Sequence, residues 1–278
     1  MRKPARIAPL LPGATAAEAK EGRARLRLGR LEIDPVTLGG ALDAIGTLVE
    51  RERGGVVVTP NVDHVVIAER REDFRAAYAA ADLSLADGKP IVWASRLLGS
   101  PLPEKVSGSD LVLPLLDRAA ARGWRVFLLG AGPGVADAAA DRLRERGVSV
   151  VGTAAPFVRV GPGEPDQGGD AAVEVIRAAR PHLVLVAFGA PKQEVWMHRR
   201  REALAPAVLI GIGASLDFLA GRVRRAPRWV SHAGLEWLWR LGREPRRLWR
   251  RYLVDDPRFL AVLMRTMRER RRLPPGRL

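Results

Sequence analysis

The chain has 278 residues, of which 47% are hydrophobic, and it contains no cysteine. This composition predicts a globular protein with a sizeable core and excludes a disulfide framework or a thiolate metal site. The longest apolar runs, such as 183–189, fall far short of the roughly 20 residues that span a bilayer. We expect no metal site, since the four histidines are not spaced like metal ligands.

The formal net charge of +15 is concentrated at the two ends of the chain. Residues 222–278 hold 17 arginines and no lysine against five acidic residues, and they carry four of the seven tryptophans. The first 30 residues hold eight basic and two acidic residues, so the region between is close to neutral. Because guanidinium binds phosphate bidentately and indole settles at membrane interfaces, the tail predicts a phosphate-rich partner such as an anionic membrane surface.

Along the chain, short apolar runs alternate with amphipathic stretches such as Val65–Ala80 and Gly134–Arg146. Strands that are apolar on both faces and separated by helices predict an α/β fold, in which helices sandwich a mostly parallel sheet. The expected strands are Val56–Thr59, Leu83–Ala86, Val126–Leu129, Val148–Val151, Leu183–Phe188 and Val208–Ile212.

The pattern changes after Gly221 to Trp, Leu and Arg residues interrupted by prolines, which is typical of two or three short helices. We therefore expect three parts: a flexible basic extension over 1–22, an α/β core over 23–221, and an Arg/Trp-rich helical appendage over 222–278.

Ligands of such folds bind beyond the carboxyl ends of the strands. Asp87 follows the second expected strand and is a candidate general base, although an aspartate there could instead bond the amides of its own turn. Thr59 and Asn61 follow the first strand, where they could bind sugar hydroxyls or simply form a turn.

A glycine-rich turn with Gly130 and Gly132 follows the third strand and opens a helix. Its free backbone N–H groups could receive a phosphate, or the turn could be an ordinary one. A nicotinamide enzyme would need an acidic residue at the end of the next strand, and Val151 and its neighbours offer none. A dinucleotide-binding oxidoreductase is therefore disfavoured.

Three further polar residues at strand ends have two interpretations each. Gln193, Glu194 and Asp217 could cap a helix or contact a ligand. No two aspartates stand two positions apart in the sequence. The Asp-x-Asp motif, which holds a divalent cation on the diphosphate of a nucleotide-sugar, is therefore absent. Arginines would then have to stabilise a leaving pyrophosphate.

Within the appendage, the spacing of Arg240, Arg247 and Arg250 would place all three near one face of a helix, although Pro245 interrupts it. The alternative is a surface helix with solvated arginines. A nucleic-acid-binding protein is a second alternative for such a tail, but it would leave the polar strand-end motifs unexplained.

Taken in order, these motifs resemble the WecG/TagA/CpsF family of bacterial glycosyltransferases, from about Leu31 to Tyr252. Ser215 stands where the family usually has threonine. The matching strings are Thr59–His64, Leu85–Gly88, Val106–Leu111, Leu129–Ala136, Gly189–Trp196, Arg225–Trp229, Gly234–Trp237 and Glu244–Tyr252.

The resemblance implies a Rossmann-like core and inverting, metal-independent transfer of a sugar, with no cofactor. The donor would be a UDP-sugar carrying N-acetylmannosamine, its uronic acid, glucose or glucuronic acid. The acceptor would be a polyprenyl-diphosphate-linked sugar at the cytoplasmic membrane face, in cell-surface polysaccharide or teichoic acid synthesis. No nucleic-acid partner is implied, and the oligomeric state stays open.

The family's site residues map onto positions already singled out. Its proposed base corresponds to Asp87, with Thr59 and Asn61 beside it and Gln193 near the nucleotide-sugar. The appendage would close over the site and touch the membrane, bringing Arg240, Arg247 and Arg250 toward the diphosphate. The extension before about Arg23 lies outside the resemblance.

Overall fold

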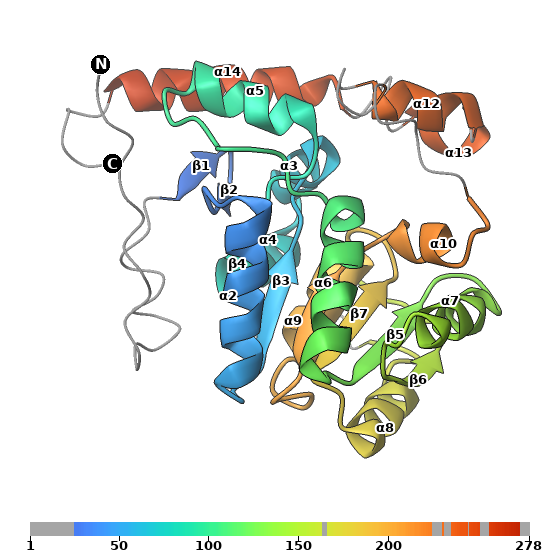
Figure 1. Cartoon of the computed structure of the whole chain (residues 1–278). Helices are drawn as coiled ribbons and strands as arrows, with labels where there is room; N and C mark the ends of the chain where they lie inside the picture. Colours follow the sequence, from blue (N-terminus) through green and yellow to red (C-terminus); the bar gives the residue numbers. More distant parts are fainter. Residues whose placement is uncertain are drawn as a thin grey trace.

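The computed structural model describes residues 25–162, 166–223, 230, 235–243, 245–250 and 256–272. At its centre is a six-stranded parallel sheet with strand order β4-β3-β8-β7-β5-β6 (Figure 1). This confirms the predicted α/β fold. The strands are β3 (Gly55–Val58), β4 (Leu83–Ser84), β5 (Val126–Gly130), β6 (Val150–Ala154), β7 (Leu183–Ala187) and β8 (Val208–Gly211).

Helices cover both faces of the sheet, and a small antiparallel hairpin of β1 (Leu26–Leu28) and β2 (Leu31–Ile33) stands beside it. The helices of the core are α2 (Leu38–Glu50), α3 (Val62–Ala68), α4 (Glu72–Ala80), α5 (Lys89–Leu97), α6 (Gly108–Arg122), α7 (Val135–Glu145), α8 (Asp170–Ala179), α9 (Lys192–Arg200) and α10 (Ser215–Leu219). Among the described residues beyond α10 lie α12 (Glu236–Arg243), α13 (Pro245–Arg250) and α14 (Arg258–Arg272).

Successive residues of a strand point to opposite faces of the sheet, so one strand contributes side chains to the hydrophobic core on each face. In β5, Phe127 and Leu129 pack with α9 on one face, whereas Val126 and Leu128 pack with α6 and α7 on the other. All five residues of β5 are buried. Burial on both sides explains why these strands are apolar throughout rather than alternating.

Most expected elements differ from the structure by one or two residues at their ends, and two differ for a clear physical reason. The stretch Val65–Ala80 is divided into α3 and α4, because Arg71 adopts an extended backbone (φ −111°, ψ 113°) and its guanidinium pairs with Asp73 in the first turn of α4. The strand expected at Val148–Val151 is shifted to β6, because the N–H of Val148 still bonds the carbonyl of Leu143 at the end of α7.

The last helix of the expected appendage packs directly on the α/β core. Phe259, Val262 and Leu263 of α14 belong to the same buried cluster as β1 and α3. The backbone N–H of Gly29 bonds Thr266 Oγ1 at 3.0 Å, and Arg265 pairs with Glu69. The boundary at Gly221 therefore stays a prediction, and removal of everything beyond it would uncover core side chains.

The expected extension over 1–22 and several appendage segments lie outside the described residues. Within the described ranges, no helix has both the length and the apolar character needed to traverse a bilayer.

Candidate functional site

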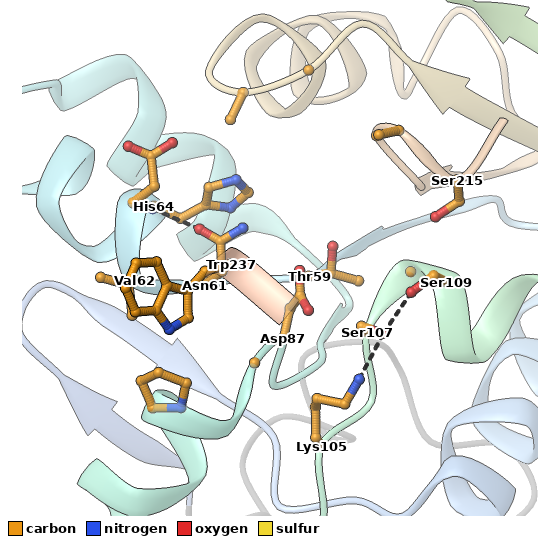
Figure 2. Close-up of a pocket in the computed structure, with 18 of the residues that line it drawn as sticks. Thr59, Asn61, Val62, His64, Asp87, Lys105, Ser107, Ser109, Ser215 and Trp237 are labelled. Carbon is orange, nitrogen blue, oxygen red and sulfur yellow. Dashed lines mark hydrogen bonds between the residues drawn. The ribbon is translucent and has the colours of Figure 1, made fainter. Parts of the chain in front are cut away.

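A cavity of about 450 Å³ opens at the carboxyl edge of the sheet, where β3, β4, β7 and β8 end. Figure 2 shows its side chains, which come from several separate loops. Four of the sequence-predicted residues line this cavity: Thr59, Asn61, Asp87 and Gln193. The structure thus brings together residues that are up to 134 positions apart in the chain.

Backbone hydrogen bonds fix the loop that carries Asp87. The N–H of Asp87 donates to the carbonyl of Pro60 at 2.9 Å, and the N–H of Val106 donates to the carbonyl of Ala86 at 2.8 Å. Gly88 has φ +98°, a conformation that favours glycine, and it lets α5 start directly after the aspartate. The half-buried carboxylate is held at the cavity wall, where a general base could meet a substrate hydroxyl.

Asn61 and Thr59 each have a structural partner as well as a place at the cavity. Asn61 is the N-cap of α3, and its Oδ1 accepts the N–H of His64 at 3.2 Å. The hydroxyl of Thr59 lies 3.5 Å from the carbonyl of Gly211 in β8. Capping of α3 therefore explains the position of Asn61 Oδ1. A role of Asn61 or Thr59 in ligand binding stays a prediction.

Beneath the cavity lies a buried aromatic group. His64 Nδ1 is 2.7 Å from the hydroxyl of Tyr78, and the ring of Phe74 stands edge-on to the imidazole. Burial raises the pKa of Tyr78 well above 10.0, and the carboxylates of Glu194, Asp87 and Asp63 raise it further. The phenol therefore stays protonated and can donate to the imidazole of His64.

Gln193 and Glu194 form a buried pair at the start of α9. Gln193 Oε1 accepts the N–H of Gly213 at 3.0 Å, and its Nε2 donates to Glu194 Oε1 at 3.0 Å. Neither side chain caps α9, whose N-cap is Pro191. Gln193 faces the cavity, whereas Glu194 lies behind it with Oε2 buried and unpartnered among the described residues. Glu194 therefore orients Gln193 rather than lining the cavity.

Burial raises the pKa of Glu194 from 4.5 to about 7, and the charge of Asp63 adds to the shift. Because the folded protein holds this proton more tightly than the unfolded chain, the free energy of unfolding should fall as pH rises from 4.5 toward 7. Glu194→Gln should remove on the order of 1 to 3 kcal/mol of that pH dependence. Urea unfolding across this range measures it.

The exposed Glu202→Gln variant is the matched control and should keep the wild-type pH dependence. A Glu194→Gln protein with an unchanged pH dependence would show that Glu194 is ionised normally in the fold.

The remaining predicted ligand residues do not line this cavity. Gly130 is the last residue of β5, Gly132 lies in the turn between β5 and α7, and Asp217 lies in α10, which packs against α7. Gly130 has φ +100°, and a Cβ there would come within 2.9 Å of the backbone of Ala187. Packing between β5 and β7 thus accounts for Gly130 by itself, and phosphate binding at the turn stays a prediction.

Gly130→Ala should lower the free energy of unfolding by about 1 to 3 kcal/mol, because it forces a left-handed backbone and a backbone clash on alanine. Gly132→Ala is the control, since a Cβ there meets only Val135 at an ordinary 3.7 Å. Chemical denaturation of both variants measures the difference. Equal stabilities would contradict the packing explanation.

The arginines predicted for the diphosphate fall in α12 and α13. The side chains of Arg240 and Arg247 lie outside the described residues, and Arg250 is exposed. Their role in catalysis therefore stays a prediction.

Several cavity residues were not predicted as site residues from the sequence. Lys105 lies at the cavity beside Ser107, which caps α6, and its Nζ pairs with Asp110 at 2.6 Å. The Ser-x-x-Asp capping box directly after Lys105 was a usable signal. Trp237, Phe259 and Leu260 bring α12 and α14 to the same cavity. Trp237 ends one of the motif strings found in the sequence, whereas no local motif marks Phe259 and Leu260.

A cavity at the carboxyl edge of a parallel sheet, with an aspartate beside hydroxyl and amide groups on a partly apolar wall, defines an α/β protein built to bind a small-molecule ligand. The chain belongs to the glycosyl transferase WecG/TagA/CpsF family, whose model matches residues 26–273. The match extends past the motif-bearing region at both ends and includes β1 and α14.

Two relatives share the name N-acetylglucosaminyldiphosphoundecaprenol N-acetyl-beta-D-mannosaminyltransferase. The protein of Bacillus spizizenii is 33% identical over 221 residues, covering 79% of this chain and 82% of the relative. That of Bacillus subtilis is 30% identical over 217 residues, covering 77% and 81%. These matches favour a glycosyltransferase over the oxidoreductase and nucleic-acid alternatives.

Proposed function

We propose that this protein transfers N-acetylmannosamine from a UDP donor to polyprenyl-diphosphate-linked N-acetylglucosamine, with inversion and without a metal ion. The convergence of Thr59, Asn61, Asp87 and Gln193 on one cavity carries the proposal. The names of two relatives specify the same sugar and the same kind of acceptor. UDP-linked N-acetylmannosaminuronic acid, glucose and glucuronic acid are the competing donors.

In the proposed reaction, Asp87 takes the proton of an acceptor hydroxyl while that oxygen attacks the anomeric carbon. The bond between the anomeric carbon and the UDP oxygen breaks, and UDP leaves with the bonding electrons. Attack from the face opposite to the leaving group inverts the configuration. The position of Asp87 on a rigid strand-end turn supports this role.

The departing diphosphate needs positive charge. We assign that task to Arg240, Arg247 and Arg250, because guanidinium donors match phosphate oxygens and can replace a cation. The absence of Asp-x-Asp in the sequence supports this division of labour. Gly130, Gly132 and Asp217 would contact the nucleotide part of the donor, and Glu194 would act through Gln193.

The acceptor's lipid chain implies work at a membrane. We place the protein peripherally on the cytoplasmic face, in the synthesis of a cell-surface polysaccharide or teichoic acid. The arginines and tryptophans of the appendage support contact with anionic lipid.

The test is UDP release from a panel of UDP-sugars, with short-chain polyprenyl-diphosphate N-acetylglucosamine and a metal chelator present. The proposal predicts acceptor-dependent release with UDP-N-acetylmannosamine. Release with another donor alone would correct the sugar, whereas a chelator that abolishes release would contradict metal independence. Failure of UDP to bind would contradict the glycosyltransferase mechanism itself.

A further inference from the structure

Two helices begin at the cavity and run away from it side by side. Lys89 and Pro90, at the start of α5, line the cavity, as do Phe259 and Leu260 at the start of α14. Near the other end, Arg270 of α14 donates to the carbonyl of Leu98 at 2.6 Å. Figure 1 shows both helices along one edge of the molecule. The pair therefore forms a surface that is continuous with the cavity opening.

The outer side of this pair carries large apolar side chains on both helices. Trp93 and Leu97 of α5 are 49% and 64% exposed, and Leu260 and Met264 of α14 are 61% and 53% exposed. Each pair is four residues apart, so both of its members project from the same side of their helix. Four large apolar side chains exposed on two adjacent helices are a feature that marks an interaction surface when they gather together.

The same surface also carries positive charge. Arg268 and Arg271 continue the exposed stripe of Leu260 and Met264 along α14, and Arg96 lies beside Leu97 on α5. Helix α5 contains no acidic residue, and the one carboxylate of α14 belongs to Glu269, which pairs with Arg265. The surface therefore combines exposed apolar side chains with arginines, Arg96, Arg268 and Arg271, that form no ion pair with the described part of the chain.

We propose that this α5–α14 surface, formed by Trp93, Leu97, Leu260 and Met264 with their flanking arginines, rests on an anionic lipid bilayer. The α/β core thus contacts the membrane through α5, in addition to any contact made by the appendage. Apolar side chains enter the boundary between headgroups and acyl chains, while the arginines contact lipid phosphates.

A second copy of the chain fits this surface less well than a bilayer does. In a two-fold symmetric dimer the same patch would face itself, so the arginines of one copy would approach those of the other. A lipid phosphate layer instead supplies the opposite charge over the whole surface.

The proposed orientation of the protein on the bilayer also affects how the substrate reaches the cavity; this part of the inference rests on the proposed function. With α5 and α14 lying on the bilayer, the cavity opens at the level of the headgroups. A diphosphate-linked sugar could then enter the cavity while its isoprenoid chain remains in the membrane.

Because the chain has no cysteine, a single introduced cysteine can carry an environment-sensitive fluorophore. We would label Leu97→Cys and Met264→Cys, with Val175→Cys on α8, which is 51% exposed, as the control. With vesicles of phosphatidylglycerol and phosphatidylcholine in equal parts, the first two labels should shift to shorter wavelength and the control should not. The shift should weaken as ionic strength rises and be smaller with phosphatidylcholine alone.

Two results would overturn the proposal. In the first, the label at position 97 shows no wavelength shift although the protein still sediments with the vesicles. That result would show that elements other than α5 make the membrane contact. The other is a blue shift that depends on protein concentration without vesicles, which would assign the surface to a second protein molecule. Substitution at these exposed positions should change stability by less than about 0.5 kcal/mol.

An assay of sugar transfer to a short-chain acceptor in solution distinguishes a failure of this proposal from a failure of the proposed function. If sugar transfer is normal but the labels show no wavelength shift with vesicles, only the proposal of a membrane-binding α5–α14 surface is contradicted. Shifted labels without transfer would contradict the proposed function alone.

Discussion

Asp87→Asn should lower turnover roughly 100- to 10,000-fold, because the amide cannot accept the acceptor's proton. The affinity for UDP-sugar should change little, since asparagine has nearly the same shape and the turn around position 87 is held by backbone bonds. Steady-state kinetics would measure the loss of turnover, and isothermal titration calorimetry with UDP would measure any change in affinity.

The control for this substitution is Asp117→Asn, at an exposed position on α6 away from the cavity. It should retain wild-type turnover. Equal activity in the Asp87→Asn variant would remove Asp87 from the role of base, whereas a joint loss of turnover and UDP binding would make it a donor-binding residue.

Removal of the proposed diphosphate arginines should have the second large effect. Alanine at Arg247 and Arg250 together should reduce turnover by roughly 100-fold or more, because the leaving UDP would lose its charge stabilisation. Lysine at both positions should restore only part of the rate, since an ammonium group keeps the charge but not the bidentate geometry.

Arg177→Ala, on the exposed side of α8, is the matched control and should leave turnover unchanged. These point substitutions are preferable to truncation after Gly221, because α14 contributes buried side chains to the core. An unchanged rate in the double alanine variant, with weaker vesicle binding, would assign these arginines to adhesion.

Most of the sheet could be predicted because β3, β5, β7 and β8 are buried throughout and therefore appear as continuous apolar runs. The hairpin of β1 and β2 was missed, since strands of three residues give too short a pattern. The break between α3 and α4 was also missed, because Arg71 has no proline or glycine beside it to signal the turn.

The candidate site was predictable to the extent that strand ends converge. Thr59, Asn61 and Asp87 each follow a strand, and parallel strands bring their carboxyl ends to one edge. The contribution of α14 could not be predicted, because an amphipathic pattern shows that a helix has an apolar side but not which surface it covers. Phe259 and Leu260 at the cavity depend on that docking.

The most direct test of the central claim is the linkage of the product, determined by NMR after incubation with UDP-N-acetylmannosamine, lipid-linked acceptor and chelator. Inverting transfer from an α-linked donor predicts a β-linked N-acetylmannosamine on the acceptor sugar. An α-linked product would contradict a single inverting displacement at the anomeric carbon with Asp87 as base, and free N-acetylmannosamine without any disaccharide would contradict transfer to this acceptor.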